Sequence, residues 1–146
     1  MNRILKQMGL AGMLSSSLAL GACSTMGMGS SQTWSMNTAE SAQAAVGKVK
    51  VANEKDGNTK VKVEVDHLAP PALAAEEGSS YVVWIKPDNG SAQNVGVLKV
   101  GSNRKGELKT VTPFKEFTVM VTLEKSPGVT IPSGAPVLDT RITMPT

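Results

Sequence analysis

Strict alternation of apolar and charged residues in two neighbouring segments is the strongest constraint in this sequence. The segments lie within VGKVKVANEKDGNTKVKVEVDHL, which runs from Val46 to Leu68. A period of two places every second side chain on the same face, so each segment predicts a strand with one buried face. Asp56-Gly57-Asn58 between them favours a turn. The chain is therefore expected to fold around an antiparallel hairpin.

The charges predict how the two strands of this hairpin are aligned. With Asp56-Gly57-Asn58 as the loop, Val51 lies opposite Val63. The same alignment brings together three oppositely charged pairs: Lys50 with Glu64, Lys48 with Asp66, and Glu54 with Lys60. Cross-strand pairs of opposite charge each contribute about 0.2–1 kcal/mol. A slip of one residue would place valines opposite lysines, so we expect this register.

Five further segments between turn signals predict strands. They are YVVWIK, AQNVGVLKV, ELKTVT, EFTVMVTLE and VLDTRI, which begin at Tyr81, Ala92, Glu107, Glu116 and Val137. Runs rich in proline and glycine, such as PDNG and SPGVTIPSGAP, separate them, and these residues favour turns. Seven short strands over residues 46–146 predict an all-β domain, a small antiparallel β-sandwich of the immunoglobulin-like type.

The first 22 residues have the parts of a secretory signal peptide. Arg3 and Lys6 form a positive start, and an uncharged, largely apolar stretch runs from Met8 to Leu20. This stretch is shorter than the roughly 20 apolar residues that span a bilayer, which disfavours a transmembrane anchor. We therefore expect residues 1–22 to be a signal that is removed.

The motif that ends this signal contains the single cysteine of the chain. LGAC, from Leu20 to Cys23, resembles the lipobox of bacterial lipoproteins. The resemblance implies that Cys23 is lipidated, that cleavage precedes it, and that the chain is extracytoplasmic and held in a membrane by this lipid. In a cell with two membranes, Ser24 after the cysteine resembles the pattern of outer-membrane lipoproteins. Two or more acyl chains provide stable anchoring where one does not.

Residues 23–45 predict the lipidated cysteine followed by a flexible linker. The segment is rich in Ser, Thr, Gly, Ala and Met, and it lacks strand alternation. Trp34 lies within it, and tryptophan favours a membrane interface or a docking contact. Packing of Trp34 on the folded domain is the alternative.

The charge balance gives no support for nucleic-acid binding. The formal net charge is +3, but Arg3 and Lys6 of the predicted signal account for two of the 15 basic residues, leaving 13 against 12 acidic residues. Basic residues do not cluster with interleaved aromatics, as they do in many nucleic-acid-binding surfaces. Nucleic acid is therefore not expected as a partner.

No constellation in the sequence predicts catalysis, a metal site or a cofactor. His67 is the only histidine, and a metal site needs several converging donors. Glu76 and Glu77 are adjacent, but neighbouring side chains of a strand point apart, and these two residues lie in a polar loop. We expect a protein that is not an enzyme.

Two aromatic residues on one predicted strand are candidates for partner binding. Tyr81 and Trp84 are three residues apart, a spacing that sends them to opposite faces of a sheet. One is expected to fill the core, and the other to cover the sheet from outside or to be exposed. With Trp34, they are the residues from which a docking contact is expected.

The region from Tyr81 onward resembles the C-terminal, extracytoplasmic domain of anti-sigma-K factors. The resemblance rests on the following residues: Tyr81 and Trp84, Pro87 to Gly90, Gly96 to Leu98, Gly106 to Leu108, Val121 to Glu124, and Pro136 to Leu138. It implies a sandwich outside the cytoplasm. The sigma-binding segment and the membrane helix of that family have no counterpart here, since a signal and a linker stand in their place.

These observations lead to two expectations about function. The first is a non-catalytic binding or envelope-sensing module that contacts an envelope protein through loops displayed on the sandwich. The alternative is a structural envelope lipoprotein without a specific ligand.

Overall fold

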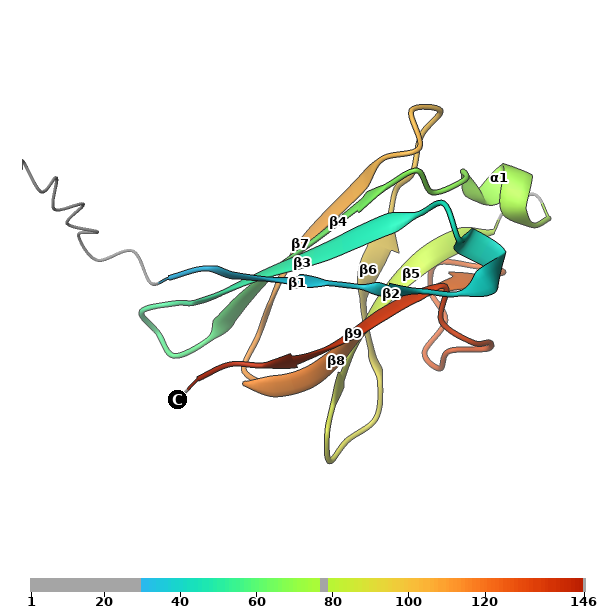
Figure 1. The fold of residues 1–146 in the computed structure, drawn as a ribbon. Helices are drawn as coiled ribbons and strands as arrows, with labels where there is room; N and C mark the ends of the chain where they lie inside the picture. The colour runs from blue at the N-terminus through green and yellow to red at the C-terminus, as the bar shows by residue number, and fades with distance from the viewer. Residues whose placement is uncertain (1–29, 77–78, 146) are drawn as a thin grey trace, which may run out of the picture.

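Antiparallel β-strands make up most of the residues that the computed structural model describes, which are 30–76 and 79–145 (Figure 1). The strands are β1 (Gln32–Ser35), β2 (Asn37–Thr38), β3 (Val46–Asn53), β4 (Thr59–Asp66), β5 (Ser80–Pro87), β6 (Gln93–Leu98), β7 (Gly106–Thr112), β8 (Glu116–Glu124) and β9 (Leu138–Thr143). The helical segments are the 3-10 turn η1 (Glu40–Ala42) and the single turn α1 (Pro71–Ala74). The predicted signal peptide, the lipobox and Cys23 lie outside the described residues.

The strands form two sheets with the topology of an immunoglobulin-like sandwich. One sheet has the order β1-β3-β4-β7, and the other has the order β2-β9-β8-β5-β6. Strands β3, β4 and β7 correspond to strands A, B and E of that fold, and β9, β8, β5 and β6 correspond to G, F, C and C′. The predicted seven-strand sandwich is therefore confirmed as β3 to β9.

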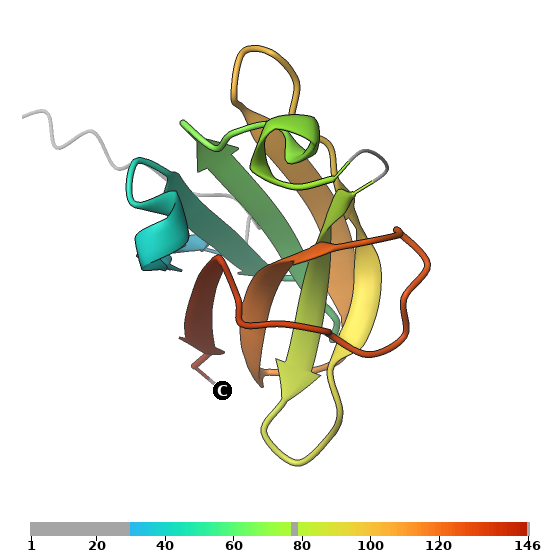
Figure 2. The ribbon, with the colours of Figure 1, turned by 90° about the vertical axis from the view of Figure 1, so that its right-hand side faces the viewer.

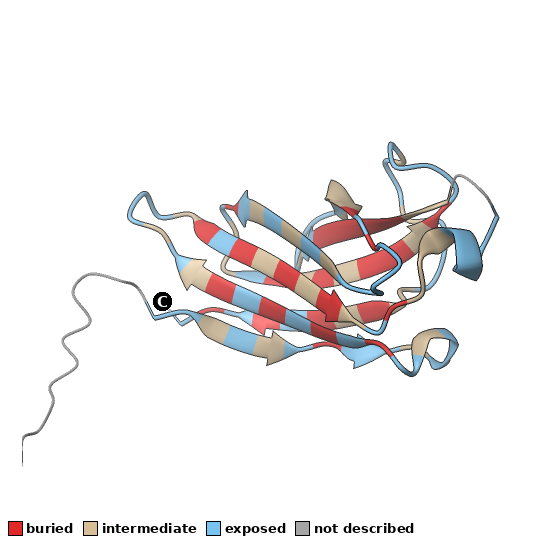
Figure 3. Ribbon diagram, turned by 90° about the horizontal axis from the view of Figure 1, so that it is seen from above, coloured by how far each residue is buried: buried red, intermediate tan, exposed pale blue. Residues whose placement is uncertain are grey.

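Alternating side chains of the two sheets form the core. The inward-facing valines of β3 and β4 are buried while the residues between them are exposed or half-buried, as the stripes in Figure 3 show; these valines are Val49, Val51, Val61, Val63 and Val65. Phe117, Val119 and Val121 of β8 are buried against them. Burial of a valine or phenylalanine side chain contributes about 1.5–3 kcal/mol, so this alternation is the main reason that the sheets stack.

The sandwich begins before Val46, which corrects the prediction of a flexible linker up to residue 45. Strand β1 pairs with β3, with Trp34 opposite Val49, and β2 pairs with β9. The chain changes sheet at the buried Met36, whose N–H donates to the carbonyl of Gly47 at 2.9 Å. A Cβ atom at position 47 would lie 2.8 Å from the sulfur of Met36, so glycine allows this crossing.

The hairpin of β3 and β4 forms as predicted, but in a register two residues away. Val51 lies opposite Val61 rather than Val63. The connection is longer than the predicted loop because Asp56 accepts a hydrogen bond from the backbone N–H of Asn58 at 3.0 Å, and because Gly57 has a φ of 89°. A shift of two keeps each side chain on its predicted face.

Two of the three predicted charge pairs persist in the shifted register. Lys50 lies 3.2 Å from Glu64, and Lys60 lies 3.5 Å from Glu54. Lys48 lies directly opposite Glu64 rather than Asp66, so its predicted pairing is wrong. Long lysine side chains reach diagonal neighbours, which is why ion pairs alone do not define a register.

The chain direction gives the sandwich two distinct ends. The start of β1, the β3–β4 turn and the C-terminal residues lie together at one end, which we call the near end (Figure 1). The connections 39–45, 67–79 (of which 67–76 and 79 are described), 99–105 and 125–137 belong to the opposite end, the far end. The described chain therefore enters the sandwich at the end opposite these four connections.

Candidate functional site

A hollow of about 340 Å³ lies at the far end, and all four far-end connections contribute to its wall. We call it the tip hollow. Its wall is mainly apolar, and its larger apolar side chains are Leu68, Leu73, Tyr81, Leu123 and Val137. Concave, largely apolar sites of 300–1,000 Å³ are typical of ligand sites.

Tyr81 supports the tip hollow from the core. Its ring is buried, and its hydroxyl donates a hydrogen bond of 2.8 Å to the carbonyl of Ala69. Burial also raises the pKa of the Tyr81 hydroxyl, which keeps it a neutral donor. Tyr81 therefore ties the connection after β4 to the sandwich.

Two basic residues at the tip hollow adopt left-handed backbone conformations. His67 has a φ of 58° and Arg104 has a φ of 60°. Such values are uncommon for residues other than glycine. They are supported by a hydrogen bond of 3.1 Å from the N–H of Leu68 to the carbonyl of Arg104, and by Asp66, which accepts from the N–H of His67 at 2.9 Å. Strain of this kind is often found at functional sites.

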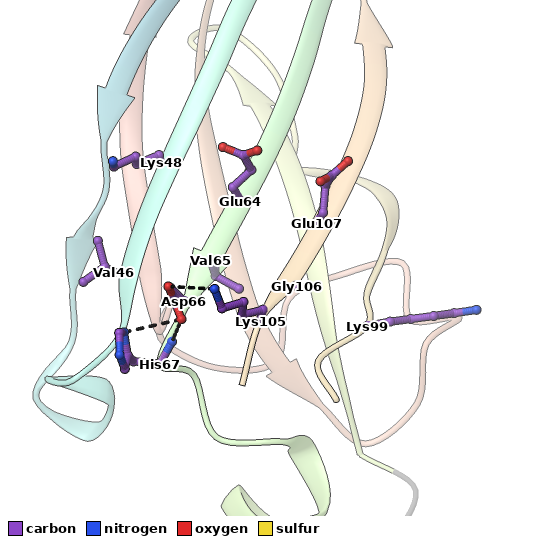
Figure 4. A pocket seen from close by; sticks show the side chains of 10 residues that line it. All are labelled: Val46, Lys48, Glu64, Val65, Asp66, His67, Lys99, Lys105, Gly106 and Glu107. Carbon is purple, nitrogen blue, oxygen red and sulfur yellow. Dashed lines mark hydrogen bonds and ion pairs between the residues drawn. The ribbon is translucent and has the colours of Figure 1, made fainter. Parts of the chain in front are cut away.

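A second hollow, of about 550 Å³, adjoins the first on the outer face of the β1-β3-β4-β7 sheet (Figure 4). We call it the charged hollow. His67 lines both hollows. The charged or titratable side chains around the second one are Lys48, Glu64, Asp66, His67, Lys99, Lys105 and Glu107.

Ion pairs order part of the charged hollow. Asp66 lies between His67 and Lys105, with its carboxylate 3.4 Å from Nδ1 of His67 and 3.6 Å from Nζ of Lys105 (Figure 4). Glu64 accepts a 2.7 Å contact from Lys62 on the same strand, and this hydrogen bond lowers the pKa of the Glu64 carboxyl. The hollow therefore presents charges of both signs.

The chemistry available to this end is recognition by apolar contact and by charge. Within residues 30–76 and 79–145, no group of three or more His, Cys, Asp or Glu side chains is placed to hold a metal ion. In the same part of the chain, no helix has the length and apolar character to span a membrane.

Tyr81 and Trp84 lie on opposite faces of their sheet, but neither is exposed. Tyr81 belongs to the core between the sheets, whereas Trp84 lies on the outer face and is fully buried. The segment 125–137 runs across that outer face, in front of β5 and β6 in Figure 2. In this conformation Trp84 therefore offers no exposed surface for a docking contact, and its role in partner binding stays a prediction. Tyr81 remains close to the candidate site, since it lines the tip hollow.

A buried chain of hydrogen bonds holds segment 125–137 over Trp84. The indole Nε1 of Trp84 donates to Oγ1 of Thr122 at 2.7 Å, and this hydroxyl donates to Glu124 at 2.7 Å. The second partner of the Glu124 carboxylate is Ser133, which donates through its backbone N–H at 3.0 Å and through its hydroxyl. Burial opposes ionisation of Glu124, but the hydrogen bonds from Ser133 and Thr122 outweigh it and lower the pKa.

The first part of segment 125–137 has its own anchor on β6. The side-chain amide of Asn94 donates to the carbonyl of Pro127 at 3.0 Å and to that of Val129 at 2.8 Å. The sequence analysis did not predict that segment 125–137 covers Trp84. Two features of the sequence indicate such a cover: the apolar residues on both faces of YVVWI, and the polar Thr122 and Glu124 at the end of an apolar strand.

Trp34 is half-buried in β1 and packs against the core. This packing agrees with the alternative prediction for Trp34, in which its side chain packs on the folded domain.

No protein-family model matches the chain, and no curated protein matches it. The resemblances to lipoprotein signals and to the anti-sigma-K domain therefore stay predictions.

Proposed function

We propose that this chain is a lipid-anchored, extracytoplasmic β-sandwich that acts as a non-catalytic binding or envelope-sensing module. The lipid on Cys23 would hold it to a membrane, and an envelope protein would be its partner. The resemblance to the anti-sigma-K domain supports a sensing role.

The main observation behind this proposal is that the chain enters the sandwich at one end and the two hollows lie at the other. The chain from Cys23 reaches the fold at the near end, where β1 begins. The tip hollow and the charged hollow lie at the far end, some eight residues of strand β3 away. An anchor at one end leaves the hollows at the other end free to meet a partner.

Exposed apolar side chains also favour the far end as the surface that meets a partner. The described residues with large, exposed apolar side chains are Val46, Leu73, Val111 and Ile131. Val46 lines the charged hollow and Leu73 lines the tip hollow. Exposed apolar groups beside a concave surface are typical of interaction sites.

In-cell cross-linking and affinity purification of the tagged protein test this proposal. We expect one discrete envelope protein with the wild-type chain, and its loss with Cys23→Ala, because the anchor places the domain within reach of its partner. Leu73→Ser should also reduce the yield, whereas Ile131→Ser is a matched control with a similarly exposed side chain. Recovery of only lipid and wall material would favour the alternative, a structural envelope lipoprotein.

A further inference from the structure

The two hollows at the far end meet at His67, and their chemistries differ. Most residues that line the tip hollow are apolar, whereas seven of the ten that line the charged hollow carry charged or titratable side chains. We propose that the far end binds an extended segment of a partner protein in which an apolar side chain lies next to a carboxylate. This inference rests on the proposed function, for which it names the kind of partner.

The apolar side chain of this segment would occupy the tip hollow. Leu73 is 73% exposed although it lines a concave surface, so it has most of its apolar area left to bury. Leu68, Leu123 and Val137 extend this surface inward. A volume of about 340 Å³ accommodates one or two large apolar side chains.

The carboxylate would lie between Arg104 and His67. Both residues line the tip hollow, and none of the described residues in its wall is acidic. The backbone hydrogen bond from Leu68 to the carbonyl of Arg104 joins the two connections that carry these basic residues. A guanidinium offers two parallel donors to a carboxylate, which makes Arg104 the principal contact.

The charged hollow favours a protein segment over a lipid. It continues from His67 along the outer face of the sheet, where its cationic residues include Lys48 and Lys105 and its anionic residues include Glu64. Polar side chains and peptide groups of an extended segment can be solvated by such a surface. An acyl chain laid on this surface would remove water from these charged groups, which is unfavourable.

Selection of peptides tests the inference without knowledge of the partner. The full chain carrying Cys23→Ala is immobilised, and a phage-displayed library of random peptides of about 12 residues is selected on it. We expect enriched peptides to share an apolar residue adjacent to Asp or Glu. In a synthetic consensus peptide, replacing the apolar residue by Ser should weaken binding about tenfold, and replacing the acid by its amide about fivefold.

Variants of the protein show whether these peptides use the proposed contacts. Arg104→Gln should weaken binding about fivefold and Leu73→Ser about tenfold. Lys55→Gln at the near end and Ile131→Ser are the matched controls, and we expect less than about twofold change with either. Arg104→Glu should restore binding to a peptide whose acid is replaced by Lys, a result that loss of folding cannot produce.

Three results would overturn the inference. They are the absence of any enriched peptide, enrichment that neither Arg104→Gln nor Leu73→Ser affects, and binding to phosphatidylglycerol vesicles that these variants abolish. The last would identify a lipid as the occupant. A fourth result, the capture in cells of an envelope partner through a different surface, would also overturn this inference but leave the proposed function standing.

Discussion

Thr122 connects the two halves of the hydrogen-bond chain that covers Trp84, so its hydroxyl is the group to remove. Thr122→Val keeps the shape of the side chain and leaves the fully buried indole N–H without its acceptor. It also takes one donor from the buried carboxylate of Glu124. A buried donor without a partner costs about 1–3 kcal/mol, and a hydrogen bond to a charged group contributes about 1.5–3 kcal/mol.

These two losses share one network and are not fully additive, so we expect a destabilisation of about 3 kcal/mol. Urea unfolding, followed by tryptophan fluorescence, measures it directly. With an m-value of about 2 kcal/mol per M, the midpoint should fall by about 1.5 M without a change in slope.

Thr118→Val is the matched control. Thr118 lies on the same face of β8, is half-buried, and is outside the chain that joins Trp84 to Glu124. Its replacement should change the free energy of unfolding by no more than about 0.5 kcal/mol. Equal midpoints for the two variants would refute the idea that this network holds segment 125–137 on the sandwich.

Three further perturbations follow from individual contacts. Hydrogen bonds lower the pKa of Glu124 in the folded state, so its contribution to the free energy of unfolding is present above the ordinary value of 4.5 and is lost as the pH falls through the folded value. Glu124→Gln should therefore flatten the acid side of the stability profile measured by urea unfolding. Gly47→Ala should destabilise the fold by about 1–3 kcal/mol in thermal unfolding, because its Cβ would crowd Met36, whereas Gly128→Ala, with open space around it, should not. Tyr81→Phe should cost about 1 kcal/mol and speed amide hydrogen exchange in the connection after β4, and unchanged exchange would contradict its role at the tip hollow.

Periodicity and turn signals were sufficient to predict strands β3 to β9 of the sandwich. The strand predicted from Glu116 to Glu124 has the same bounds in the structure. Strand β1 escaped detection because only Gln32 and Trp34 face inward in its four residues, and Gln32 is polar. A segment this short carries no readable alternation, and its pairing with β3 supplies the stabilisation instead.

The hairpin register was beyond what its charges could predict. Both the predicted and the observed registers keep the valines on one face, so hydrophobic burial does not separate them. The side chain of Asp56 decides between them, since its hydrogen bond to Asn58 organises a longer connection. Such a contact depends on a turn conformation that composition alone does not specify.

The candidate site could be predicted only in part. Tyr81 was singled out, and it lies at the tip hollow. The hollow itself is assembled from four connections that are distant in sequence, and Leu73 and Arg104 carry no local pattern that relates them. The burial of Trp84 depends likewise on segment 125–137 folding back over β5, a long-range contact.

The most direct test of far-end recognition is site-specific photo-cross-linking in cells. A photoreactive amino acid is placed at Leu73 on the far end in one variant, and at Asn89 on the near end in another. We expect a single cross-linked protein from position 73, lost when Arg104→Gln is added, and none from position 89. Equal cross-linking from both positions, or a product from position 89 alone, would contradict recognition by the far end.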